Sequence, residues 1–144
     1  MESSLTDITR VIQLAVAPVF LLTAIATMIN ALNTRLGRIV DRRRVVQERL
    51  QTRADAAADA AQLEIRTLVR RSRLVYYAIF CAVLSALLVC LVVAGAFLGA
   101  LLGVDLAPSV AALFIAAMLA MIAGLGLFLR EVFRGVRAGT HNRP

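Results

Sequence analysis

Three long apolar runs constrain this chain more than any other feature of its sequence. They cover residues 11–32, 74–103 and 109–129, which are 22, 30 and 21 residues long. A helix rises about 1.5 Å per residue, so about 20 apolar residues cross the hydrocarbon core of a bilayer. A helix at the surface of a small soluble protein needs a polar face, and long stretches of these runs have none. The sequence therefore predicts an integral membrane protein with three transmembrane helices.

The segments around the apolar runs are short, except for one. The lead, residues 1–10, is acidic at its start and arginines follow the first run, so we expect a retained helix and not a cleaved signal peptide. Between the second and third runs, residues 103–109 read GVDLAPS, which is typical of a turn. Asp105 is predicted to cap the third helix, with Pro108 in its first turn.

The basic residues predict how the chain is oriented. All 16 are arginines: 11 lie between Arg35 and Arg73, four follow Leu129 and one lies in the lead. Because cytoplasmic loops carry the excess of positive charge, we expect residues 34–73 and the tail 130–144 in the cytoplasm and the N-terminus outside. A strongly basic soluble domain would indicate nucleic acid, but these arginines adjoin apolar runs. We therefore expect the anionic inner leaflet as partner and no nucleic acid.

Residues 34–73 are predicted to form a cytoplasmic αα-hairpin whose arms continue the first two membrane helices. There is no glycine or proline between Arg38 and Ser72, and both ends must return to the membrane. Thr52 and Asp55 resemble a helix start, which places the turn near residues 51–59. Apolar or small residues recur close to a 3.6-residue period, at Leu36, Ile39, Val46, Leu50, Ala57, Ala61, Ile65 and Leu68.

The hairpin predicts which charged residues of its two arms lie opposite each other. With the turn near residues 51–59, Asp41 would face Arg66 and Arg44 would face Glu64. Each exposed pair contributes only about 0–1 kcal/mol, so these contacts would determine register more than stability.

Two sets of residues in and after the first helix are candidates for function. A polar seam follows one side of that helix, with Gln13, Thr23, Thr27, Asn30 and Thr34. Polar groups are costly against lipid, so the seam faces either another helix or, in an oligomer, a water-lined pore. A second set anchors the chain at anionic headgroups, or binds an anion or a partner there, and consists of Arg35, Arg38, Arg42, Arg43 and Arg44.

Small residues recur at every fourth position of the second and third runs. This spacing is typical of close packing between membrane helices, and the two stripes are predicted to meet within one chain, with part of the alanine stripe open to a second copy. The stripes are Gly95, Gly99 and Gly103, and Ala112, Ala116, Ala120 and Gly124. Cys81 and Cys90 lie about half a turn out of phase and are predicted to be buried small residues.

Enzyme chemistry is not indicated. No ionisable residue lies in the central part of any run, and there is no carboxylate pair, His–Cys set or glycine-rich phosphate loop. The lone His141 has no second ligand nearby. We therefore expect no catalytic residue, cofactor or metal.

The residues from Ala17 to Arg44 resemble the signature of a bacterial family of small integral membrane proteins of unknown function. The segment reads APVFLLTAIATMINALNTRLGRIVDRRR, and members of the family pair an Ala-Pro-x-Phe-Leu-Leu helix with an Arg-Leu-x-Arg-Ile-Val-Asp-Arg continuation. The matching positions are Pro18, Phe20, Leu21, Leu22, Asn33, Arg35, Arg38, Asp41, Arg42 and Arg44. The resemblance covers about residues 8–135 and implies a bacterial three-span protein without implying an activity.

The sequence thus predicts an all-α fold: one membrane domain with three transmembrane helices and a cytoplasmic hairpin, in the bacterial inner membrane. Two classes of function stay open. One is a non-enzymatic structural or regulatory protein that self-associates and binds anionic lipid or a partner through its hairpin. The other is an oligomeric ion channel or pore lined by the polar seam.

Overall fold

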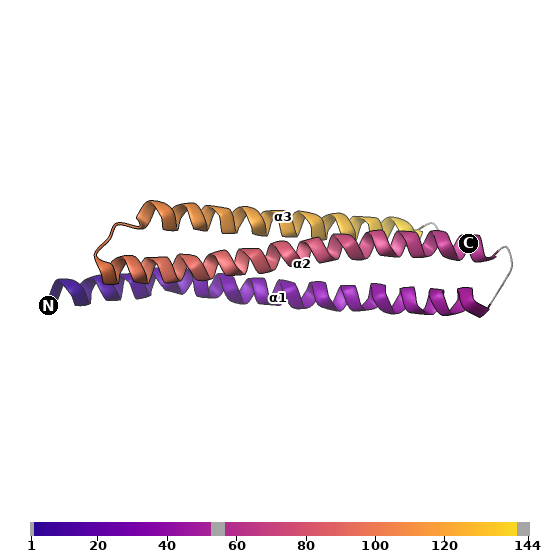
Figure 1. Ribbon diagram of the computed structural model, residues 1–144, viewed down its shortest axis with the longest axis horizontal. Helices are drawn as coiled ribbons and strands as arrows, with labels where there is room; N and C mark the ends of the chain where they lie inside the picture. The colour runs from indigo at the N-terminus through magenta and orange to yellow at the C-terminus, as the bar shows by residue number, and fades with distance from the viewer. Residues whose placement is uncertain (1, 53–56, 141–144) are drawn as a thin grey trace. The chain divides into compact units, whose positions relative to one another are not determined.

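Three helices make up the chain in the computed structural model, which describes residues 2–52 and 57–140. They are α1 (Glu2–Thr52), α2 (Ala57–Leu102) and α3 (Ala107–Thr140), and the described residues contain no strand. Each helix includes a segment long and apolar enough to cross a membrane, namely Ile8–Gln51, Asp59–Leu102 and Ala107–Gly135 (Figure 1). The predicted all-α fold with three membrane-spanning helices is confirmed.

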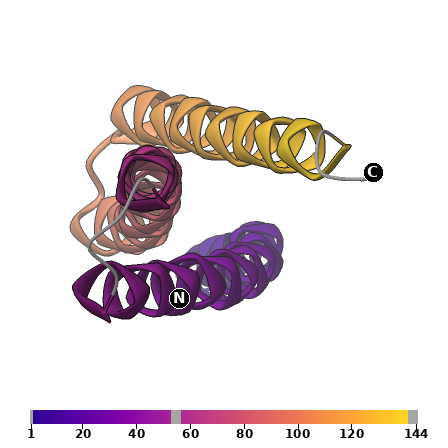
Figure 2. The ribbon, with the colours of Figure 1, turned by 90° about the vertical axis from the view of Figure 1, so that its right-hand side faces the viewer.

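The chain divides into two compact units, and each helix contributes to both. The first unit is Met1–Ile29 with Cys81–Ala123, and the second is Asn30–Phe80 with Gly124–Pro144. In the second unit, α1 ends at Thr52 and α2 begins at Ala57 and returns beside α1, as Figure 2 shows from that end. This confirms that the hairpin arms continue the first two membrane helices. Thr52 closes α1 and does not start the next helix, and Asp55 lies outside the described residues.

Buried residues follow a seven-residue repeat along each helix. This repeat is the pattern by which long helices pack side by side with a left-handed twist. The repeat runs through Ile25, Leu32, Ile39 and Val46 on α1, through Leu68, Val75, Ala82 and Val89 on α2, and through Ala117, Gly124 and Glu131 on α3. The predicted apolar face of the hairpin arms is buried or half-buried at every position whose side chain is described.

The core of the first unit joins all three helices. Ile25 of α1, Val89 of α2 and Ala117 of α3 are buried in one apolar cluster. Ser85 is also fully buried, and its hydroxyl donates a hydrogen bond of 2.8 Å to the backbone oxygen of Ala117. A hydroxyl in an apolar interior needs such a partner, so this bond fixes α2 against α3.

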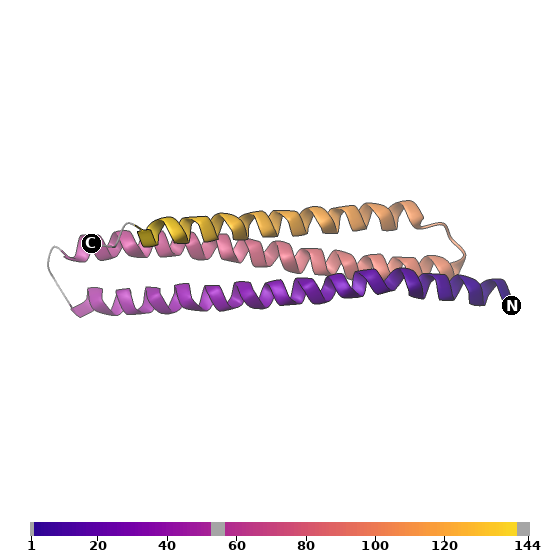
Figure 3. The same cartoon turned by 180° about the vertical axis from the view of Figure 1, so that it is seen from behind.

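A glycine-terminated turn joins α2 to α3 within the first unit (Figure 3). Gly103 has a φ of 64°, and the N–H of Val104 donates to the oxygen of Gly99 at 3.2 Å, which is a Schellman ending. The carboxylate of Asp105 accepts a hydrogen bond of 3.1 Å from the N–H of Ala107, and Pro108 lies in the first turn of α3. The predicted turn and its capping aspartate are confirmed.

The predicted meeting of the small-residue stripes holds in part: Gly95 approaches α3, and in the second stripe Ala120 is half-buried and Gly124 is buried. A Cβ on Gly95 would lie 3.2 Å from Cγ2 of Val110, so α2 and α3 approach closely there. However, Ala112 and Ala116 are exposed, whereas Ala117 is buried. The physical reason is geometric: positions four apart advance about 40° around a helix at each step, so the stripe leaves an interface that repeats every seven residues.

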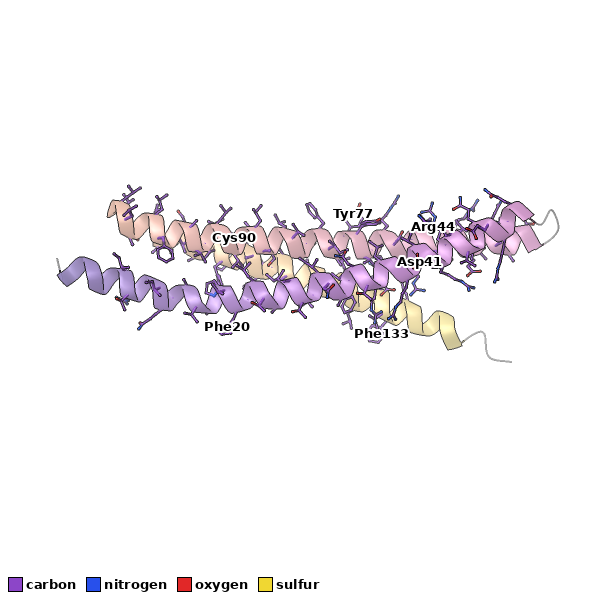
Figure 4. The ribbon with its side chains drawn as sticks, turned by 90° about the horizontal axis from the view of Figure 1, so that it is seen from below. Phe20, Asp41, Arg44, Tyr77, Cys90 and Phe133 are labelled. Carbon is purple, nitrogen blue, oxygen red and sulfur yellow. The ribbon has the colours of Figure 1, made fainter. Side chains whose placement is uncertain are left out.

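The prediction for the cysteines needs correction. Cys90 is exposed on α2, where Figure 4 labels it, although it was predicted to be buried; both cysteines are free thiols and Cys81 is half-buried. Residues 130–140, predicted to belong to a tail, continue α3 as helix, and residues 141–144, with His141, lie outside the described residues. The exposed Tyr76, Tyr77 and Phe80 lie at the start of the apolar part of α2.

Candidate functional site

The most prominent polar feature of the second unit is a buried carboxylate held by two arginines. The side chain of Glu131, on α3, is 2% exposed. Its Oε2 accepts a hydrogen bond of 3.2 Å from Nη1 of Arg35, on α1, and its Oε1 accepts one of 2.8 Å from Nη2 of Arg71, on α2. One carboxylate therefore links all three helices, and we call these three residues the Glu131 cluster.

The sequence around the cluster explains why these side chains meet. Glu131 is seven residues after Gly124, so the repeat that buries Gly124 also turns Glu131 toward α1 and α2. Gly135, one turn further on, leaves space for Arg71: a Cβ there would lie 2.7 Å from its Nη2. The guanidinium carbon of Arg35 lies 5.1 Å from the ring centroid of Phe128, which adds a cation–π contact.

Both oxygens of the Glu131 carboxylate are occupied by arginine donors. Two guanidinium charges surround one negative charge, and each carboxylate oxygen already accepts a hydrogen bond. The Nε of Arg71 is buried without a partner among the described residues, so the cluster retains one unused donor. Because its two partners lie on α1 and α2, this carboxylate is placed to hold the three helices together.

Sequence reasoning missed this cluster. The sequence patterns place Arg35 at the lipid surface and Glu131 in the tail, and they do not distinguish Arg71 or Phe128 from their neighbours. One signal for Glu131 does exist in the sequence, since it stands seven and fourteen residues after Gly124 and Ala117. The partners of Glu131 could not be found that way, because they depend on which faces of α1 and α2 pack against α3.

The predicted arginine set divides into two groups in the structure. Arg35 and Arg42 form ion pairs within the chain, Arg42 with Glu64 at 2.9 Å. The other three are exposed and have no acidic partner among the described residues. These are Arg38, Arg43 and Arg44, which we call the free arm arginines; Figure 4 labels Arg44.

The predicted pairs between the arms are not the ones the structure forms. Glu64 contacts Arg42, two residues before the predicted Arg44. No ion pair joins Asp41 to Arg66 within residues 2–52 and 57–140. Exposed ion pairs contribute little energy, so long charged side chains pair with whichever neighbour is in reach and do not determine the register of the arms.

Every member of the polar seam is exposed on the outside of the chain. The hydroxyl of Thr23 donates to the oxygen of Val19 at 3.3 Å, and those of Thr27 and Thr34 donate in the same way, one turn back, at 3.0 Å. By contrast, the side-chain amides of Gln13 and Asn30 have no partner among the described residues. The seam therefore does not pack against another helix of the same chain.

The described parts of the chain contain no group of three or more His, Cys, Asp or Glu side chains that could hold a metal ion.

By length and composition, the three helices make the chain a multi-pass membrane protein. The chain belongs to the family described as protein of unknown function (DUF2721), whose model matches residues 15–140. This match confirms the predicted membership of an uncharacterised family. No curated protein and no solved structure matches the chain.

Proposed function

We propose that this protein is a non-enzymatic, self-associating protein of the bacterial inner membrane whose arginine-rich helical arms bind the anionic lipid surface on the cytoplasmic side. The observation that carries the proposal is the exposure of the free arm arginines beside the membrane-spanning part of α1, without an acidic partner among the described residues. Each basic residue near an anionic leaflet contributes about 1 kcal/mol. The distribution of arginines supports placing the N-terminus outside and the C-terminus in the cytoplasm.

Neutralising the free arm arginines is expected to remove the preference for anionic lipid. In bilayers of phosphatidylcholine with a minority of phosphatidylglycerol, the variant Arg38→Gln/Arg43→Gln/Arg44→Gln should lose its enrichment of phosphatidylglycerol, by about fivefold for each guanidinium that contacts the surface. Electron spin resonance of spin-labelled lipids measures that enrichment. High salt should reduce it in the unmodified protein as well.

The matched control is Arg10→Gln, because Arg10 is an exposed arginine outside the arms. This control should keep the full enrichment. Equal enrichment in the triple variant and in the unmodified protein would contradict the proposal.

Self-association is supported by the unpartnered amide of Asn30. An amide exposed to hydrocarbon without a hydrogen-bond partner is costly, and an asparagine can both donate to and accept from the same residue of a second copy. The threonine hydroxyls do not demand a partner, since they donate to their own helix. This difference favours a helix interface between copies over a pore, which needs water along the whole seam.

We expect Asn30→Leu to raise the dissociation constant between copies about 3- to 30-fold, because polar contacts between membrane helices contribute about 0.6–2 kcal/mol. Förster transfer between labelled copies, diluted in lipid, measures the constant. Thr27→Val is the control, since Thr27 is exposed on the same helix and its hydroxyl donates to the oxygen of Thr23 in its own helix. A constant unchanged by Asn30→Leu would exclude Asn30 from the interface.

The alternative is an oligomeric pore lined by the polar seam. It is favoured by the exposure of all five seam residues. Proteoliposomes distinguish the two functions: a pore passes ions and Asn30→Leu changes the flux, whereas the proposed function gives no flux above empty vesicles.

A further inference from the structure

A shallow groove on α3 combines an apolar floor with two arginines. Its volume is about 560 Å³, and all of its lining belongs to the second unit: Gly126, Leu129, Arg130, Phe133 and Arg134. These positions are three or four apart, so they follow one face of the helix. A volume of this size lies within the range of small-molecule sites in proteins.

The two ends of the groove differ in chemistry. At one end a Cβ on Gly126 would meet nothing within 4 Å, so the glycine leaves an open notch in the apolar part of α3. At the other end Arg130 and Arg134 lie one turn apart, and neither has an acidic partner among the described residues. Phe133, labelled in Figure 4, is exposed and lines the same groove.

We propose that this groove binds one anionic phospholipid, with the phosphate between Arg130 and Arg134 and an acyl chain along the notch at Gly126. A guanidinium pair matches a phosphate by charge and by hydrogen-bonding geometry. An acyl chain matches the apolar remainder of the groove. A second copy of this chain fits less well, because a twofold-related partner would bring its own Arg130 and Arg134 against the first pair.

This site differs from the proposed contact of the arms with lipid. The arms present charge alone and would exchange lipids freely, whereas the groove has both a charged and an apolar part and would retain one lipid. Because the two lie on different helices, either can fail while the other holds.

The test counts the phosphatidylglycerol molecules that remain bound to the purified protein in native mass spectrometry. We expect the unmodified protein to retain one such lipid, and Arg130→Gln/Arg134→Gln to bind it about 30-fold more weakly, at about fivefold per guanidinium. Gly126→Leu should also lose the retained lipid while keeping both charges. A phosphatidylglycerol with short acyl chains should bind the unmodified protein more weakly, which tests the notch without any substitution.

Two controls separate the site from general effects. Arg43→Gln/Arg44→Gln removes the same charge from the arms, and Gly37→Leu adds the same side chain at another open glycine; both should retain the lipid. Retention by Gly126→Leu together with equal binding of short and long chains would overturn the proposal. So would an equal loss in Arg43→Gln/Arg44→Gln, or displacement of the lipid by equimolar glycerophosphate.

Discussion

Glu131→Gln is expected to lower the free energy of unfolding by about 3 kcal/mol. The substitution keeps the size of the side chain but removes the charge that two guanidiniums contact, and it leaves the buried part of Arg71 without its anion. Removing one partner of a buried ion pair costs about 3–5 kcal/mol, and the value here lies at the lower end because Arg35 is 43% exposed and can reach water. Reversible unfolding in mixed detergent micelles measures the change.

The control for this experiment is Glu64→Gln. Glu64 pairs with Arg42 at a similar distance of 2.9 Å, but both side chains are about half exposed. Glu64→Gln should therefore lower the free energy of unfolding by less than about 1 kcal/mol. The variant Arg71→Met/Glu131→Leu should be more stable than Glu131→Gln, because it removes the uncompensated charge together with its partner. Equal, small losses in Glu131→Gln and Glu64→Gln would show that the cluster does not hold the helices together.

Gly99→Leu is expected to lower the free energy of unfolding by about 2–3 kcal/mol, the largest loss after that of Glu131→Gln. A Cβ at position 99 would lie 3.2 Å from the backbone oxygen of Val104 and 3.4 Å from Cβ of Leu106. Backbone atoms of a tight turn cannot move aside as a flexible side chain can, so the larger leucine must displace the connection between α2 and α3. The same unfolding measurement applies.

Gly37→Leu is the matched control for Gly99→Leu, because a Cβ on Gly37 meets no atom within 4 Å. A leucine there should leave the stability unchanged or raise it slightly, since leucine favours a helix more than glycine does. If both variants unfold alike, the close approach at Gly99 does not limit the fold.

Local patterns predicted much of the fold because each depends on a few neighbouring residues. Hydrophobic length predicted the membrane-spanning segments, and the glycine, aspartate and proline of residues 103–109 predicted the turn that the structure forms at Gly103 and Asp105. The continuation of the helix along the arginine-rich arm was also predictable, since no proline or glycine follows Gly37 in α1.

Contacts between helices were predicted less well, because they depend on the register and rotation of each helix. The predicted position of the turn paired Glu64 with Arg44, whereas the structure pairs it with Arg42. The spacing of small residues pointed to Ala112 and Ala116, whereas the seven-residue repeat buries Ala117. In both cases, which residues meet depends on how the buried faces of all three helices pack together.

The sequence by itself determined that the chain has three membrane-spanning helices with a basic connection, because the transfer of apolar residues into a bilayer depends on composition and length alone. Only the tertiary structure decided that Arg35 and Arg71 converge on Glu131, while Arg38, Arg43 and Arg44 have no acidic partner among residues 2–52 and 57–140. The reason is that an arginine meets a carboxylate on another helix only when both helices have packed, and the energy of that packing comes from residues far apart in the sequence.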